Sequence, residues 1–181
     1  MDTISTISNE LNATPTRFPD CCLVISSTFL EKLSALLPQA PKYTLSIGSG
    51  SGLLESLLAH KYCNITVQGV EVNSTVNRYI AEENMHVVNG GWGLCSAAEG
   101  AAAWMFVYPR DPKLISKYID ILDSSITEKI VWLGPKVDWG DYEKRLRQSS
   151  FSELNFLEDC GLAPYEIAVI AKKPWFPANQ L

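Results

Sequence analysis

The chain has 181 residues, of which 46% are hydrophobic and 19% charged, a composition that can fill the core of one domain and that excludes a disordered chain. The net charge of −5 leaves no excess of Lys and Arg to neutralise phosphates, so we expect neither a nucleic acid nor an anionic membrane as a partner. No apolar run is long enough to span a bilayer, and the polar N-terminus does not have the pattern of a secretory signal.

The five cysteines are scattered along the chain, and no Cys-x-x-Cys pair occurs. The two histidines, His60 and His86, lie far apart in the sequence. We therefore predict no metal site. Scattered cysteines of odd number are typical of reduced thiols, which predicts a cytoplasmic protein.

The first 20 residues are rich in Ser, Thr, Asn and Pro and show no sustained periodicity. We predict that residues 1–20 form a tail or loop, which is either flexible or folded over the core as a lid. Thr28 and Glu31 then have the spacing of a capping box, and leucines at helical spacing predict a helix from there to Pro38.

From residue 43 onward, strand and helix signals alternate. Seven apolar and often β-branched runs predict strands over 43–47, 65–72, 86–88, 101–108, 129–133, 151–157 and 165–172. Four amphipathic runs predict helices over 53–62, 73–80, 111–122 and 138–146.

Strands that are apolar on both faces and separated by helices indicate a parallel sheet that is covered on both sides. The last two strands are joined by a short turn around Gly161 and Pro164, which only an antiparallel pairing permits. The sequence therefore predicts a single α/β domain over residues 1–181. We expect a three-layer Rossmann-like sandwich, with a seven-stranded, mostly parallel sheet that ends in a C-terminal antiparallel hairpin.

Three alternating glycines, Gly48, Gly50 and Gly52, lie between the first predicted strand and the helix after it. Glycine lets the chain turn sharply there and lets a ligand approach the backbone without meeting a Cβ atom. A loop at the carboxyl end of a parallel strand, before a helix N-terminus, is typical of a nucleotide-cofactor site. No Lys follows Gly52, which excludes a phosphate-binding P-loop, and the third glycine of a Gly-x-Gly-x-x-Gly dinucleotide fingerprint is missing.

The Gly-x-Gly-x-Gly spacing resembles motif I of the class I S-adenosylmethionine-dependent methyltransferases, and the resemblance extends over residues 43–173. It implies S-adenosylmethionine as the cofactor, with loop contacts from Ser46, Gly48, Ser49, Gly50 and Gly52. In that family the loop usually begins with an acidic residue two places before its first glycine, a place taken here by Ser46. A serine can form a hydrogen bond, but it cannot offer a carboxylate to the ligand.

Glu71 ends the second predicted strand, 19 residues after the last glycine of the loop. This is close to the spacing at which a carboxylate reaches ribose hydroxyls, and the resemblance implies an acid at this place as well. Val72 is then expected beside the adenine or the ribose. After the third predicted strand, the resemblance implies that Asn89 and Gly90 contact the adenine, and Trp92 either covers a flat ligand or belongs to the core.

The segment Tyr108-Pro109-Arg110 follows the fourth predicted strand, where the resemblance implies motif IV. The Asn/Asp-Pro-Pro-aromatic form of that motif, used by amino-directed methyltransferases, is absent. We predict catalytic roles for Tyr108, as a hydrogen-bond donor or as a general base with a lowered pKa, and for Arg110, as a contact to an anionic group. The alternative is a core Tyr108 and a surface Arg110. Asp138 is either a base or a substrate contact or, more simply, a helix cap.

Two functions stay open at this point. The glycine spacing and Glu71 favour an S-adenosylmethionine-dependent methyltransferase that acts on a small-molecule substrate. Ser46 and the altered motif IV favour a methyltransferase-like protein that does not transfer methyl, such as a cyclase, an isomerase or a cofactor-binding partner of another enzyme. Of the five tryptophans, we expect some to line an aromatic substrate pocket or the face of a homodimer and the others to belong to the core.

Overall fold

The computed structural model describes residues 3–124 and 126–174. The strands of this part of the chain are β1 (Thr44–Ile47), β2 (Val67–Glu71), β3 (Met85–Val87), β4 (Ala103–Val107), β5 (Lys129–Pro135), β6 (Glu153–Phe156) and β7 (Glu166–Lys172). They form one seven-stranded sheet in the order β3-β2-β1-β4-β5-β7-β6. The first five strands pair in parallel, whereas β7 runs antiparallel to both β5 and β6. The predicted sheet with its terminal hairpin is confirmed.

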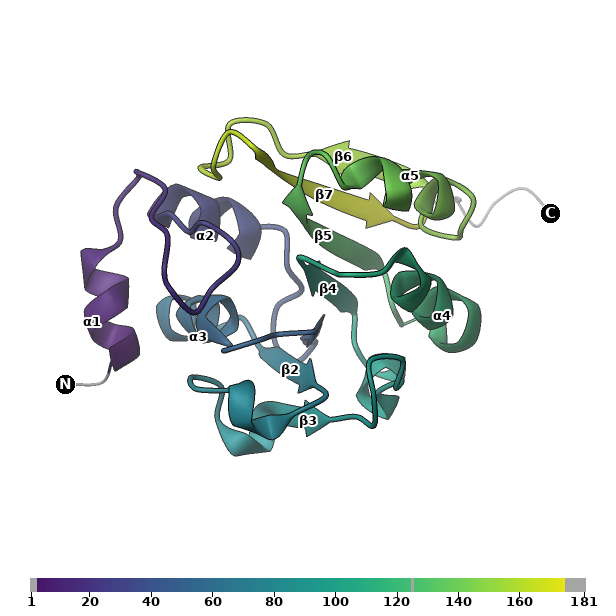
Figure 1. Cartoon of the computed structure of the whole chain (residues 1–181), viewed down its shortest axis with the longest axis horizontal. Coiled ribbons are helices and arrows are strands. Elements are labelled where there is room, and N and C mark those ends of the chain that lie inside the picture. Colours follow the sequence, from purple (N-terminus) through teal and green to yellow (C-terminus); the bar gives the residue numbers. More distant parts are fainter. Residues whose placement is uncertain (1–2, 125, 175–181) are drawn as a thin grey trace.

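The α-helices of the described residues are α1 (Thr3–Glu10), α2 (Ser27–Ser34), α3 (Leu53–Lys61), α4 (Pro112–Leu122) and α5 (Trp139–Arg147). Short 3-10 turns are η1 (Ser74–Val76), η2 (Glu82–Asn84) and η3 (Ser96–Glu99). The helices α1, α2 and α3 lie on one side of the sheet, and α4 and α5 lie on the other (Figure 1). The three-layer α/β arrangement is therefore present, and the carboxyl ends of β1 to β5 share one edge of the sheet.

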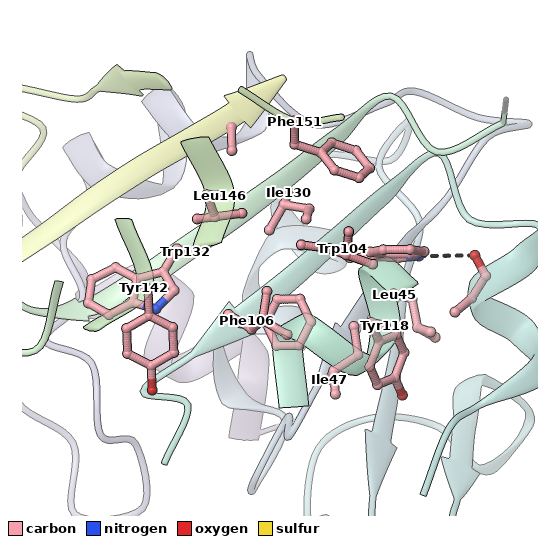
Figure 2. Close-up of a cluster of buried hydrophobic side chains, with 14 of the residues drawn as sticks. Leu45, Ile47, Trp104, Phe106, Tyr118, Ile130, Trp132, Tyr142, Leu146 and Phe151 are labelled. Carbon is pink, nitrogen blue, oxygen red and sulfur yellow. Dashed lines mark hydrogen bonds between the residues drawn. The ribbon is translucent and has the colours of Figure 1, made fainter. Parts of the chain in front are cut away.

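Two hydrophobic layers enclose the sheet, because successive residues of a strand face opposite sides. On β4, Trp104 and Phe106 pack toward α4 and α5, whereas Met105 packs toward α2 and α3. Figure 2 shows Trp104 and Phe106 beside Tyr118 of α4, and the ring centroids of Trp104 and Tyr118 lie 5.7 Å apart. These fully buried rings hold the middle of the sheet in place.

The same alternation on β1 decides where the side chain of Ser46 lies. Leu45 and Ile47 pack into the layer of α4 and α5. Ser46 therefore faces the opposite layer, where its hydroxyl meets the side chain of Glu55 on α3. Both partners are buried, so this contact belongs to the interior of the molecule.

The prediction of a tail or loop was wrong for residues 3–10, which form α1. Ile4, Ile7 and Leu11 recur at helical spacing and pack into the layer of α2 and α3. The Ser- and Thr-rich composition hides this apolar stripe, and packing against α3 supplies the stability that composition alone does not. Whether the N-terminal segment acts as a lid stays a prediction.

The prediction of a helix over residues 73–80 was also wrong, since only the short turn η1 forms there. The Oδ1 atom of Asn73 accepts hydrogen bonds from the N–H and the hydroxyl of Thr75. The side-chain amide of Asn77 forms two hydrogen bonds with the backbone of Ile80. Its Oδ1 atom accepts from the N–H at 3.0 Å, and its Nδ2 atom donates to the carbonyl oxygen at 2.7 Å. Such local bonds offer the backbone an alternative to the helix.

The remaining helices follow the expected pattern, with small shifts at their ends. α2 begins at the N-cap Ser26, whose Oγ accepts from the N–H of Phe29 at 3.0 Å, rather than at the predicted capping box. Asp111 caps α4 as expected, by accepting from the N–H of Lys113. No helix within the described residues is long and apolar enough to cross a membrane. The five cysteines all lie in the described part of the chain, and all are free.

Candidate functional site

The glycine loop leaves β1 with all three glycines at positive φ, at +78° for Gly48, +60° for Gly50 and +78° for Gly52. A Cβ atom at Gly48 or Gly50 would meet nothing within 4 Å, so these two residues border open space. At Gly52 a Cβ atom would lie 2.4 Å from Cγ1 of Ile80. The first two glycines therefore leave room beside the backbone, whereas the third is required by packing.

Glu71, at the carboxyl end of β2, holds this loop in place. Its Oε1 atom accepts from the N–H of Gly50 at 2.7 Å, and Oε2 accepts from the N–H of Val72 at 3.1 Å. Each carboxylate oxygen can accept more than one hydrogen bond. Glu71 can thus order the loop and still accept from the hydroxyls of a ligand.

A recess of about 60 Å³ lies between the loop and the ends of β2 and β3. Predicted site residues among its lining are Gly48, Glu71, Val72 and Gly90. Val88 and Leu114, which we did not predict, add apolar walls. The lining thus combines a carboxylate, which can accept hydrogen bonds from hydroxyl groups, with aliphatic walls.

Two predicted adenine contacts do not line this recess. Asn89 is exposed, and Trp92 is 45% exposed and linked through its carbonyl oxygen to Nζ of Lys117 at 2.7 Å. Trp92 is therefore not a core residue, whereas Trp104, Trp132 and Trp139 are buried. The remaining tryptophan, Trp175, lies outside the described residues. A ligand contact by Asn89 or Trp92 and a homodimer face stay predictions.

A second recess of about 60 Å³ lies on the other side of the loop. It is lined by residues 48–51 and by the start of α3, and Asp20, Cys21 and Cys22 of the N-terminal segment complete it. Asp20 is anchored by the hydroxyl of Tyr79, which donates to Oδ2 at 2.8 Å. Burial raises the pKa of the Cys21 thiol to about 12, so this thiol is protonated at neutral pH.

Glu55 is a further residue beside the loop that the sequence did not predict. It is 2% exposed, and its Oε1 atom accepts from the Ser46 hydroxyl at 2.6 Å. Burial raises its pKa to about 7, the Ser46 bond opposes this shift, and the charge of Glu71 adds to it. Ser46 therefore does not face the loop as an open contact but holds a carboxylate that lines the second recess.

Tyr108 lies at the carboxyl end of β4, with a strained φ of 49°. Its hydroxyl donates to Oε1 of Glu166 at 2.7 Å. Glu166 is 3% exposed and also accepts from the N–H groups of Val24 and Ala163. Burial and the bond to Glu166 raise the pKa of Tyr108, so the predicted lowering of this pKa is wrong.

The other predicted residues near the carboxyl ends of β4 and β5 form fewer side-chain contacts than Tyr108. Arg110 is exposed, and it joins no ion pair among the described residues. Asp138 takes the N-cap position of α5, but its side chain makes no capping bond. A cavity of about 450 Å³ opens between Lys136, the loop after β6 and Glu166. The catalytic roles of Tyr108 and Arg110 stay predictions.

Comparison with known proteins identifies the fold. No family model matches the sequence, and no curated protein does. Among solved structures, precorrin-6y C5,15-methyltransferase from Geobacter metallireducens superposes with a TM-score of 0.61 at 12% identity, over 91% of this chain and 100% of the other. The 23S rRNA methyltransferase ErmE gives 0.54 at 16% identity, over 86% of this chain and 71% of its own.

Human N-acetylserotonin methyltransferase in complex with S-adenosylmethionine gives a TM-score of 0.56 at 14% identity. The match covers 81% of this chain and 50% of the human enzyme, so the chain spans half of that protein. Identities this low establish the fold and leave substrates open. The chain has the class I S-adenosylmethionine-dependent methyltransferase fold.

Proposed function

We propose that the protein is an S-adenosylmethionine-dependent methyltransferase that acts on a small molecule. The observation that carries this proposal is the charge around the glycine loop. Glu71 is bonded to the loop itself, and Glu55 and Asp20 line the recess beside it. A glycine loop for phosphate would need cations there, whereas carboxylates suit a ligand with ribose hydroxyls and a positive charge.

The residues present fit such a cofactor. Glu71 would accept from the ribose hydroxyls while Val72 and Val88 border the base, and Gly48 and Gly50 would let it approach the backbone. When bound, the cofactor supplies a methyl group on a positively charged sulfur, ready for transfer to a nucleophile. The chain's own contribution is then to bind, to orient the acceptor and to exclude water.

A small-molecule acceptor is supported by two features. The cavity beside Glu166 has a volume of about 450 Å³, within the usual range for small-molecule sites, and it lies on the same edge of the sheet as the loop. The net charge of −5 disfavours a nucleic-acid substrate. The names of the compared structures do not decide this point, since they include both an RNA methyltransferase and small-molecule enzymes.

The second candidate function is a cofactor-binding protein that does not transfer methyl. One observation favours it: the Tyr108 hydroxyl, which lies where a catalytic group was expected, is already bonded to Glu166 and has a raised pKa. Such a group is a poor base. Methyl transfer needs little acid–base help when the acceptor is already nucleophilic, so the first candidate stands ahead.

Titration calorimetry of the full chain with S-adenosylmethionine tests the proposal. We expect micromolar binding in the wild type and its loss in Glu71→Ala, with Glu99→Ala, an exposed acid on η3, as the matched control. Isotopically labelled methyl groups then separate the two candidates, because only a methyltransferase moves label into an acceptor from a metabolite extract. Absence of binding in the wild type would overturn both.

A further inference from the structure

Next to the glycine loop lies a buried carboxyl group, that of Glu55, which forms no ion pair within residues 3–124 and 126–174. Glu55 is 2% exposed, yet it borders the recess formed by residues 48–51. Its Oε1 atom is held by the Ser46 hydroxyl, and no Lys or Arg forms an ion pair with it among the described residues. Burying a carboxylate without a cation costs free energy, so a cation that binds beside Glu55 would favour its ionised form.

The surroundings of Glu55 add negative rather than positive charge. The titratable groups around its two cavities, other than those of α3, are Asp20, Cys21 and Cys22 from the N-terminal segment, Glu71 from β2, and Arg78 and Tyr79 after η1. Arg78 is the cation of this set, and its guanidinium lies 3.6 Å from Oδ2 of Asp20. On α3 itself, His60 also borders the outer cavity.

Glu55 also has a route for proton exchange. It lines a cavity of about 350 Å³ between α1, α3 and the segment that follows η1. Glu55 therefore lines this cavity as well as the glycine loop recess. A proton can therefore leave toward the cavity while a ligand occupies the loop.

We propose that Glu55 supplies the counter-charge for the sulfonium of the cofactor, and that binding drives one proton from Glu55 into solvent. The inference rests on the proposed function, since it requires a cationic ligand in the loop. Ser46 takes part as a positioning residue, because its hydroxyl donates to the carboxylate form. Ser46 of β1 stands where the family usually has an acid, and Glu55 of α3 thus provides the carboxylate instead.

The direction of the pH dependence follows from charge. In the free protein Glu55 has a pKa of about 7, and a positive charge beside it lowers that pKa. Below pH 7 the cofactor must displace a proton in order to bind, so affinity falls with pH. One linked proton predicts a dissociation constant about tenfold larger at pH 6 than at pH 8.

The test is calorimetric titration of the full chain with S-adenosylmethionine from pH 6 to pH 8. We expect the tenfold dependence in the wild type and a flat profile, with weaker binding at pH 8, in Glu55→Gln. Histidines in general titrate in this range, so His60→Gln is the matched control and should keep the wild-type profile. S-adenosylhomocysteine, which lacks the sulfonium charge, should show a smaller dependence.

A second measurement needs no variant. Titrations of the wild type in buffers of different ionisation enthalpy report the protons released, and we expect close to one at pH 6 and close to none at pH 8. A flat wild-type profile, an unchanged profile in Glu55→Gln or an equal dependence for S-adenosylhomocysteine would overturn the inference alone. Absence of cofactor binding at every pH would instead overturn the proposed function on which it rests.

Discussion

The two halves of the sheet's carboxyl edge are built on opposite principles. On the side of β1 and β2, the glycine loop borders open space at Gly48 and Gly50, and its carboxylates can still accept hydrogen bonds. On the side of β4 and β7, Tyr108 and Glu166 satisfy each other inside a closed network that includes the backbone of Val24. The first half leaves polar groups free beside open space, whereas in the second half the Tyr108 hydroxyl and the Glu166 carboxylate already bond to each other.

This difference explains why cofactor binding has stronger physical support than catalysis. A binding site needs unsatisfied polar groups next to open space, which the glycine loop offers. A general base needs a pKa near the working pH and a polar atom that is free for the substrate, whereas the Tyr108 hydroxyl has a raised pKa and is bonded to Glu166. Substitutions in the two halves should therefore differ in effect: those at the glycine loop should weaken cofactor binding, and those around Glu166 should lower the free energy of unfolding.

The largest effect should come from Glu166→Ala. This change removes the acceptor of three donors, the buried N–H groups of Val24 and Ala163 and the partly buried hydroxyl of Tyr108. Leaving such donors unsatisfied predicts a loss of about 4 kcal/mol in the free energy of unfolding. Urea denaturation measures it.

The control for this change is Glu166→Gln, which keeps one acceptor oxygen and should lose markedly less stability. Cofactor affinity, measured at a temperature where both variants are folded, should stay close to that of the wild type. A Glu166→Ala variant that is as stable as the wild type but cannot bind the cofactor would show that Glu166 serves binding rather than stability.

Within the glycine loop, Gly52→Ala and Gly48→Ala should separate packing from ligand clearance. A Cβ atom at Gly52 would lie 2.4 Å from Ile80, and φ is positive as well, which together predict a loss of about 3 kcal/mol. At Gly48 only the positive φ acts, so the predicted loss is about 1 kcal/mol.

Binding should follow the opposite order when it is compared in folded protein. Gly48→Ala places a methyl group where the cofactor approaches, and it should bind more weakly than Gly52→Ala in calorimetry. Equal losses of stability in the two variants would show that the space at Gly48 is not open in solution.

The fold was predictable from the sequence because its signals are local and repeated. Alternating apolar strands and the short final turn are enough to define a parallel sheet with a terminal hairpin. The two misjudged segments failed for local reasons. Side-chain bonds of Asn73 and Asn77 replace a helix by turns, and the stripe of Ile4 and Ile7 on α1 is hidden among small polar residues.

The site was predictable only where a motif marks it. The glycines and Glu71 were found by their spacing, and they do lie together around the loop. Glu55 was missed because its role depends on a contact between two elements, β1 and α3. One signal was present: a polar Ser46 in a buried strand needs a partner, and Glu55 is an acid on an otherwise apolar helix face.

Glu55 also predicts a pH dependence of stability. Burial raises its pKa from an ordinary value of 4.5 to about 7, so between these values the folded state holds more protons than the unfolded state. The stabilisation is complete below pH 4.5 and is lost as pH rises through 7. Between pH 5 and pH 8 the wild type should lose roughly 2 kcal/mol relative to Glu55→Gln.

The measurement is urea denaturation of both proteins at several pH values, compared as a difference so that other titrating groups cancel. Saturating S-adenosylmethionine should reduce the slope, because it favours the ionised carboxylate. Parallel pH profiles of the two proteins would show that Glu55 does not titrate in this range.

An effect as small as that of Gly48→Ala should come from Tyr108→Phe, which removes one hydroxyl and keeps the ring. The lost bond to Glu166 predicts a decrease of about 1 kcal/mol in the free energy of unfolding, since Glu166 keeps its two backbone donors. Cofactor affinity should not change, because the hydroxyl faces the β7 side rather than the glycine loop. A variant with full stability and wild-type cofactor binding, but with no transfer of labelled methyl, would instead assign Tyr108 to the chemistry. That result would place an active site at the carboxyl end of β4, and Glu166 would then be the residue that orients the Tyr108 hydroxyl.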